Sequence, residues 1–203
     1  MNDKVDLWEI ENSLIADGYE VVCGVDEAGR GSLAGAVFAS AVILPPNICI
    51  SDLDDSKKLS AEKREELYDE IVSCAIAFGI ASSDNNEVDE FNVLNATYLA
   101  MNRAIEKLDV KPDIALIDGN RNSGIAHKNI CVIKGDSKSA SIAAASILAK
   151  VSRDRYMLEL AGKYPNYAFE KHKGYGTKLH YEKLMQFGAS EIHRHSFLRK
   201  MRG

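Results

Sequence analysis

Two adjacent carboxylates followed by a glycine-flanked arginine are the residues most able to do chemistry in this chain. Residues 24–31 read Gly-Val-Asp-Glu-Ala-Gly-Arg-Gly, so Asp26 and Glu27 end an apolar, β-prone run. A buried carboxylate must find a cation or shift its pKa. Arg30 or a metal ion could supply that cation, and the glycines around Arg30 let the backbone approach a phosphate or sugar. Alone, these eight residues fit a binding site and an ion-paired turn equally well.

Two other short apolar runs also end on an acid: residues 114–117 precede Asp118, and residues 130–133 precede Asp136. Ligand sites of α/β sheets gather at strand ends, so four carboxylates would converge if these ends are neighbours. Carboxylate ligands without Cys or His favour Mg²⁺ or Mn²⁺, and two such ions can cleave a phosphodiester. Asp118 could instead belong to a turn and Asp136 could cap a helix. For Asp154, inside a helix beside arginines, we expect an exposed ion pair.

The elements that must position these acids alternate between strands and helices. Hydrophobic patterning predicts strands over 20–26, 34–44, 75–82, 114–117 and 130–133, with the second and third able to pair antiparallel. It predicts helices over 7–15, 60–73, 90–108, 139–160 and 178–187. The helix from residue 139 opens with small side chains, which allow close packing on a sheet. The pattern indicates an α/β fold with a mixed sheet covered by helices.

Length and composition are typical of one soluble domain, with 203 residues, 46% hydrophobic and 27% charged. No apolar run approaches the roughly 20 residues that span a bilayer. With no secretory signal and four widely spaced cysteines, we expect a cytoplasmic protein without membrane association, zinc or disulfides. The net charge of −5 divides into −12 over residues 1–149 and +7 over residues 150–203. Such a basic tail could seat phosphates or be a solvated helix face.

The ordered motifs of this chain resemble those of bacterial ribonuclease HII over residues 21–197. The resemblance rests on residues 24–31, Asp-Ser-Lys-Lys-Leu at 55–59, Ile-Asp-Gly at 117–119, Lys-Gly-Asp-Ser at 134–137 with the Ala/Ser-rich helix through 154, His-Lys-Gly-Tyr-Gly-Thr at 172–177 and His-Arg-His-Ser-Phe at 193–197. It implies an RNase H-like mixed β-sheet flanked by helices, with a small C-terminal helical extension. We expect a catalytic body over 1–163 and a basic substrate-binding part of the same domain over 164–203.

The resemblance also implies an activity: hydrolysis of the RNA strand of RNA–DNA hybrids, and cutting 5′ of ribonucleotides embedded in DNA. Two Mg²⁺ or Mn²⁺ ions would act in the site, leaving 3′-hydroxyl and 5′-phosphate ends. The family's metal-binding carboxylates match Asp26, Glu27, Asp118 and Asp136.

Substrate recognition is implied at two further places. Gly29-Arg30-Gly31 matches the loop that recognises the ribose 2′-hydroxyl, which distinguishes RNA from DNA. Tyr175 matches the tyrosine that stacks on the next deoxyribose. Arg30 is then interpreted as part of substrate recognition rather than as the counter-ion of the carboxylates. Residues expected to grip the nucleic-acid backbone are Lys57 or Lys58, together with Lys171, Lys173, Lys178 and Arg194.

Departures from the family pattern are few. Ser32 and Ala36 stand where the family often has proline, which calls the rigidity of the loop into question. No sliding-clamp motif is recognised before Gly203. We expect a monomer whose partners are RNA–DNA hybrids and DNA with embedded ribonucleotides.

Three other functions fit parts of the pattern. A junction resolvase would cut branched DNA without any ribose. A non-catalytic hybrid-binding module would not need all four carboxylates. A small-molecule phosphohydrolase would leave the basic tail without a purpose.

Overall fold

The protein is built around a five-stranded mixed sheet. The computed structural model describes residues 6–53 and 59–199, and its sheet has the order β3-β2-β1-β4-β5. The strands are β1 (Val22–Ala28), β2 (Val37–Ile43), β3 (Ala77–Ser83), β4 (Ile114–Asp118) and β5 (Asn129–Val132). β1, β2 and β3 pair antiparallel, whereas β4 is parallel to both β1 and β5. The predicted mixed sheet is confirmed, as is the antiparallel pairing of its second and third strands.

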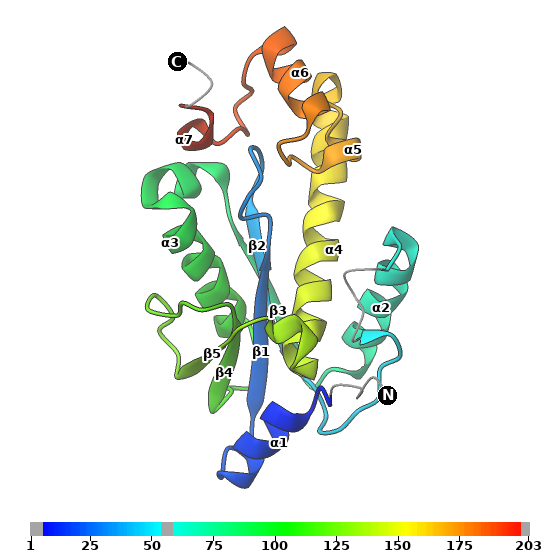
Figure 1. Ribbon diagram of the computed structural model, residues 1–203, viewed down its shortest axis with the longest axis vertical. Coiled ribbons are helices and arrows are strands. Elements are labelled where there is room, and N and C mark those ends of the chain that lie inside the picture. The colour runs from blue at the N-terminus through cyan, green and yellow to red at the C-terminus, as the bar shows by residue number, and fades with distance from the viewer. Residues whose placement is uncertain (1–5, 54–58, 200–203) are drawn as a thin grey trace.

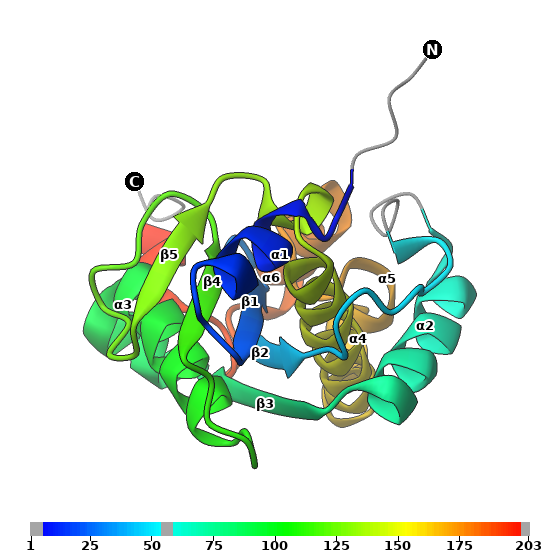
Figure 2. The same cartoon turned by 90° about the horizontal axis from the view of Figure 1, so that it is seen from below.

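Helices cover both faces of this sheet (Figures 1 and 2). The longer ones are α1 (Glu9–Ala16), α2 (Ala61–Cys74), α3 (Asn85–Glu106), α4 (Ala140–Lys163) and α6 (Lys178–Phe187). Side chains of α3 pack on one face, against Cys23 and Val25 of β1. Side chains of α2 and α4 form a second core on the other face, against Val42 of β2. β1 is therefore buried on both sides, which explains its nearly continuous apolar sequence.

Helix α4 lies unusually close to β1. A Cβ atom built on Gly24 would lie 2.1 Å from the carbonyl carbon of Ser141, a distance that no side chain could occupy. The alanine- and serine-rich start of α4 leaves room for this approach, as predicted. The contact places the following turns of α4 directly beside Asp26.

Two of the differences between predicted and observed bounds have a clear physical reason. β1 continues through Asp26 and Glu27 to Ala28, so the acids lie inside the strand, because β2 continues the ladder opposite them. α3 begins at Asn85 instead of residue 90 because Asp84 and Glu87 form a capping box with reciprocal bonds of 2.9 Å. A non-helical Asn92, with φ of 66°, separates this first turn from the periodic part of the helix.

The helices after α4 gather at one end of the molecule (Figure 1): α5 (Phe169–His172), α6 and α7 (His195–Leu198). Their core holds three buried histidines, with the rings of His172 and His180 stacked at 4.2 Å. Nε2 of His180 lies 3.1 Å from Nε2 of His193. That residues 164–203 form a substrate-binding part of the same domain stays a prediction. In the part of the chain that the structure describes, no helix is long and apolar enough to cross a membrane.

Candidate active site

The central strand carries the first two candidate residues. Asp26 is 6% exposed, and its Oδ1 accepts a 2.7 Å hydrogen bond from the main-chain N–H of Glu27. Because side chains alternate along a strand, Asp26 and Glu27 leave β1 on opposite faces. Gly24, two residues before Asp26, faces α4, and Ser146 of that helix also hydrogen-bonds Asp26. Glu27 lines a cleft of about 410 Å³ beside α3.

The neighbouring strand brings Asp118 to the same end of the sheet. β4 runs parallel to β1 with Ile117 opposite Val25, so Asp118 ends β4 beside Asp26. Oδ1 of Asp118 accepts a 2.6 Å hydrogen bond from the main-chain N–H of Gly135. This bond fixes the 3₁₀ turn Gly135–Ser137, which contains the buried Asp136. All four predicted carboxylates thus belong to connected segments at one end of the sheet.

Burial and mutual repulsion dominate the electrostatics of the acids. Burial raises the pKa of Asp26 well above its usual range, and the charges of Glu27 and Asp118 raise it further. Burial also raises the pKa of Glu27, although Arg30 partly offsets this by an ion pair of 3.1 Å. Negative charges held this close are stabilised by a cation. Arg30 supplies one for Glu27, so the interpretation that Arg30 is not a counter-ion is wrong, while its role in recognition stays a prediction.

The chemistry of the donors suits a hard divalent cation, because the four acids supply carboxylate oxygens and none of the four is a Cys or His. The side chains do not form a ready-made cage: among residues 6–53 and 59–199, no group of three or more His, Cys, Asp or Glu is arranged to hold a metal. The alternation of Asp26 and Glu27 across β1 and the ion pair of Glu27 with Arg30 account for this.

The loop after β1 lies beside Tyr175. Ser32 and Tyr175 form an isolated antiparallel bridge, and the N–H of Leu33 donates to the carbonyl of Gly174 at 2.8 Å. Gly29 and Tyr175 both line a cleft of about 250 Å³ that also contains Glu27. The structure therefore brings the predicted loop and the predicted tyrosine together next to an acid. Lys57 and Lys58 lie outside the described residues.

Two fully buried arginines support this loop. Arg153 donates from Nε to the carbonyl of Ala36 and from Nη1 to the carbonyl of Lys173, both at 3.0 Å. Arg194 donates from Nε to the carbonyl of Gly35 and from Nη1 to that of Arg30, both at 2.9 Å. The prediction that Arg194 grips the nucleic-acid backbone is wrong, because its side chain is wholly inside the protein.

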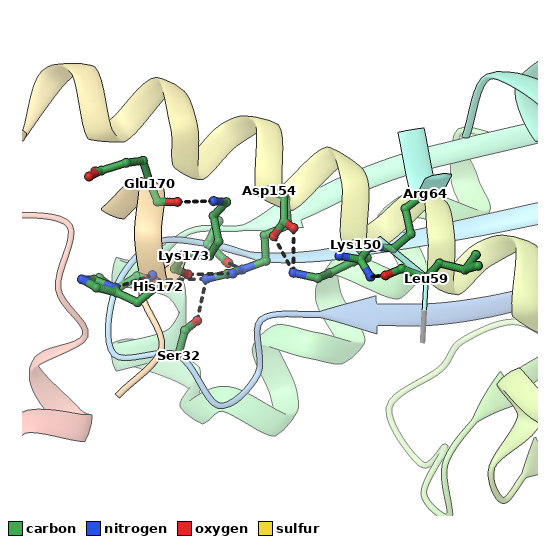
Figure 3. A network of polar contacts seen from close by, with 12 residues as sticks. Ser32, Leu59, Arg64, Lys150, Asp154, Glu170, His172 and Lys173 are labelled. Carbon is green, nitrogen blue, oxygen red and sulfur yellow. Dashed lines mark hydrogen bonds and ion pairs between the residues drawn. The ribbon is translucent and has the colours of Figure 1, made fainter. Parts of the chain in front are cut away.

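Sequence reasoning missed three polar residues in the smaller cleft: Arg64, Ser146 and Lys150. Ser146 and Lys150 are four residues apart on α4 and so share one helix face, which was a usable signal. Lys150 also forms the ion pair with Asp154, at 2.6 Å, within the polar network of Figure 3. Asp154 forms an ion pair as expected, but its partner is Lys150 instead of a neighbouring arginine, and its side chain is only 20% exposed.

Comparison with known proteins decides the family. The family model described as Ribonuclease HII matches residues 23–200. The chain belongs to the ribonuclease HII family. Ribonuclease HII of Caldicellulosiruptor bescii is 52% identical over 99% of this chain and 98% of that protein. The Burkholderia mallei protein of the same name is 54% identical over 88% of this chain and 83% of its own length.

Solved structures show the same fold. Ribonuclease H2 from Pyrococcus horikoshii OT3 has a TM-score of 0.72 at 25% identity, covering 89% of this chain and 96% of its own. RNase HII from Archaeoglobus fulgidus, solved in complex with PCNA, has a TM-score of 0.68 at 25% identity, over 86% and 93% of the two chains. The predicted RNase H-like fold is confirmed. As a ribonuclease HII, the protein is a hydrolase acting on RNA in RNA–DNA hybrids, and the reading as a non-catalytic binding module is set aside.

Proposed function

We propose that this protein cuts the phosphodiester bond 5′ of a ribonucleotide, in RNA–DNA hybrids and at ribonucleotides embedded in duplex DNA, by two-metal hydrolysis. Asp26, Glu27, Asp118 and Asp136 would hold two Mg²⁺ or Mn²⁺ ions. These ions would activate the attacking water and stabilise the leaving oxygen, giving 3′-hydroxyl and 5′-phosphate ends.

The observation that carries this proposal is that four acids lie at one end of the sheet: Asp26 and Glu27 on β1, Asp118 at the end of β4, and Asp136 in the turn that is bonded to Asp118. Burial raises the pKa of Asp26, and the negative charges of Glu27 and Asp118 raise it further. Carboxylates in such surroundings are stabilised when a divalent cation neutralises them. A solved relative by fold, Bst-RNase HIII, was crystallised with Mn²⁺, at 19% identity and a TM-score of 0.63 over 83% of this chain and 63% of its own.

The chain's own residues have distinct roles in this scheme. Gly29, Arg30 and Gly31 would contact the 2′-hydroxyl of the ribonucleotide, and Tyr175 would stack on the following deoxyribose. Arg30 has 47% of its side chain exposed, so it can reach a substrate if Glu27 turns from it to a cation. Lys150 and Arg64 line the same cleft as Tyr175 and could contact phosphates.

The decisive experiment uses duplex DNA with one ribonucleotide, a continuous RNA–DNA hybrid and a branched all-DNA substrate, each with Mg²⁺, Mn²⁺ or a chelator. We expect metal-dependent cleavage of the first two and none of the third. Asp118→Asn should lower the rate by about 100-fold or more, because it removes a ligand for charge that develops in the transition state. Asp109→Asn, the same charge change at an exposed site before β4, is the control.

Each arm can fail separately. Cleavage at full rate by Asp118→Asn would refute the metal role of these acids. Cleavage of the hybrid but not of the single-ribonucleotide duplex would refute the proposed cutting at embedded ribonucleotides. Cleavage of the branched DNA would favour a junction resolvase. Three further statements stay predictions: that the protein is cytoplasmic, that it is a monomer and that it does not bind a sliding clamp. Size-exclusion chromatography with and without a clamp protein tests the monomeric state and the clamp binding.

A further inference from the structure

Ser32 occupies the point where the loop after β1 meets the rest of the protein. It is fully buried, and its Oγ donates a 2.8 Å hydrogen bond to the carbonyl of Gly29. The main-chain N–H of Ser32 reaches the same carbonyl at 3.3 Å. Oγ in turn accepts a 2.6 Å hydrogen bond from Nη2 of Arg153 (Figure 3). The hydroxyl thus uses both its donor and an acceptor site to join the loop to α4.

Arg153 extends this connection to Tyr175. Its guanidinium carbon lies 5.2 Å from the centre of the Tyr175 ring, and its Nη1 bonds the carbonyl of Lys173, two residues before the tyrosine. Tyr175 is also bridged directly to Ser32 through the main chain. One guanidinium therefore contacts both the loop and the segment that carries Tyr175.

Gly29 rests directly on this guanidinium. Its φ is +94°, and a Cβ there would lie 1.9 Å from Nε of Arg153. The position of the loop is therefore set by Arg153, while the orientation of its first peptide is set by Ser32. A buried hydrogen bond to a charged donor is among the stronger ones in proteins.

We propose that Ser32 is a positioning residue for substrate selection: its hydroxyl, held by Arg153, fixes the distance between the Gly29–Gly31 loop and Tyr175. The inference rests on the proposed function, in which the loop contacts the 2′-hydroxyl and Tyr175 stacks on the next sugar. A substrate with one ribonucleotide needs both contacts at once, one on each side of a ribose–deoxyribose junction. A continuous hybrid offers a 2′-hydroxyl at every step, so it depends less on that fixed distance.

The test compares kcat and KM of the wild type and Ser32→Ala on the single-ribonucleotide duplex and on the continuous hybrid. Misplacement of binding groups lowers kcat, so we expect kcat on the junction substrate to fall by about 10-fold or more, but on the hybrid by less than about 3-fold. Ser32→Thr keeps the hydroxyl and should keep the wild-type ratio of the two rates. Ser83→Ala removes another fully buried serine hydroxyl, at the end of β3, and should leave both rates unchanged.

A merely structural role would lower both rates by the same factor, and that result would overturn the inference. An unchanged ratio in Ser32→Ala, or a ratio lowered equally by Ser83→Ala, would also overturn it. If circular dichroism shows that Ser32→Ala is unfolded, Ser32→Cys takes its place with the same expectation, because a thiol fills the site but hydrogen-bonds weakly. A wild type that does not cut the junction substrate refutes the proposed function instead, so the two failures are distinguishable.

Discussion

The acids of β1 and β4 and the arginines beneath the neighbouring loop are both groups of buried like charge, and the protein treats them in opposite ways. Arg153 and Arg194 donate to the carbonyls of the chain that surrounds them. Burial raises the pKa of Asp26, and the neighbouring acids Glu27 and Asp118 raise it further. Burial and the charge of Arg153 lower the pKa of Arg194 to about 9, and Nη2 of Arg194 has no hydrogen-bond partner among the described residues. Like charges therefore oppose one another in both groups, but only the arginines donate several hydrogen bonds to main-chain carbonyls, which suits them to an architectural role and the acids to a ligand.

The three buried histidines differ from both of these groups, because they stay neutral. The N–H of Ser190 donates to Nδ1 of His193 at 2.9 Å, so Nε2 of His193 carries the proton that points at Nε2 of His180. Nδ1 of His180 then donates to the carbonyl of Tyr175 at 3.0 Å. Burial, reinforced by neighbouring histidines, lowers the pKa of His180 and of His193 to about 4.

The largest predicted effect is on the free energy of unfolding, and it tests the structural role of the buried arginines. Arg153→Met would leave four acceptors without this donor, in three buried hydrogen bonds and one partly buried one, so we expect the free energy of unfolding in urea to fall by about 3 kcal/mol or more. Arg155→Met, two residues further along the same helix, removes a surface ion pair with Glu65 and should cost less than about 1 kcal/mol. Equal losses in the two variants would show that buried and exposed arginines do not differ here.

Acid should destabilise the histidine cluster next. Because the folded pKa values of about 4 lie below the unfolded value of 6.5, the unfolded state binds more protons between these values, and stability falls as the pH drops from 6.5 to 4. We expect His193→Gln to reduce this fall in the free energy of unfolding by on the order of 1–2 kcal/mol, measured by urea titrations at several pH values. His127→Gln, the same substitution at a histidine outside the cluster, is the control.

The smallest predicted effect concerns the acids and has the opposite sign. The folded pKa of Asp26 is raised, so the folded state loses stability as the pH rises from about 4 towards that pKa. Asp26→Asn should therefore raise the free energy of unfolding by about 1 kcal/mol at neutral pH in chelator, while abolishing cleavage. Mn²⁺ should raise the Tm of the wild type more than that of the variant. A variant less stable than the wild type in chelator would contradict the repulsion inferred for this site.

The sequence made some of these features predictable and hid others. Apolar runs ending on Asp118 and near Asp136 predicted the strands and the edge where the acids meet. Arg153 and Arg194 were hidden because arginine is usually exposed and because their partners are main-chain carbonyls, which every residue possesses. The ion pair of Arg30 with Glu27 depends on how the backbone turns after β1, which spacing alone does not determine.

The contact between Gly24 and the start of α4 has a consequence for how much this protein can vary. Since main chain meets main chain there, the separation of β1 and α4 is independent of any side chain. At other interior positions one apolar residue can replace another if its neighbours repack. At position 24 every substitution would add a Cβ, because glycine is the smallest residue. A homologue or a redesigned version that preserves this spacing must therefore keep glycine at that position, whatever else in its interior has changed.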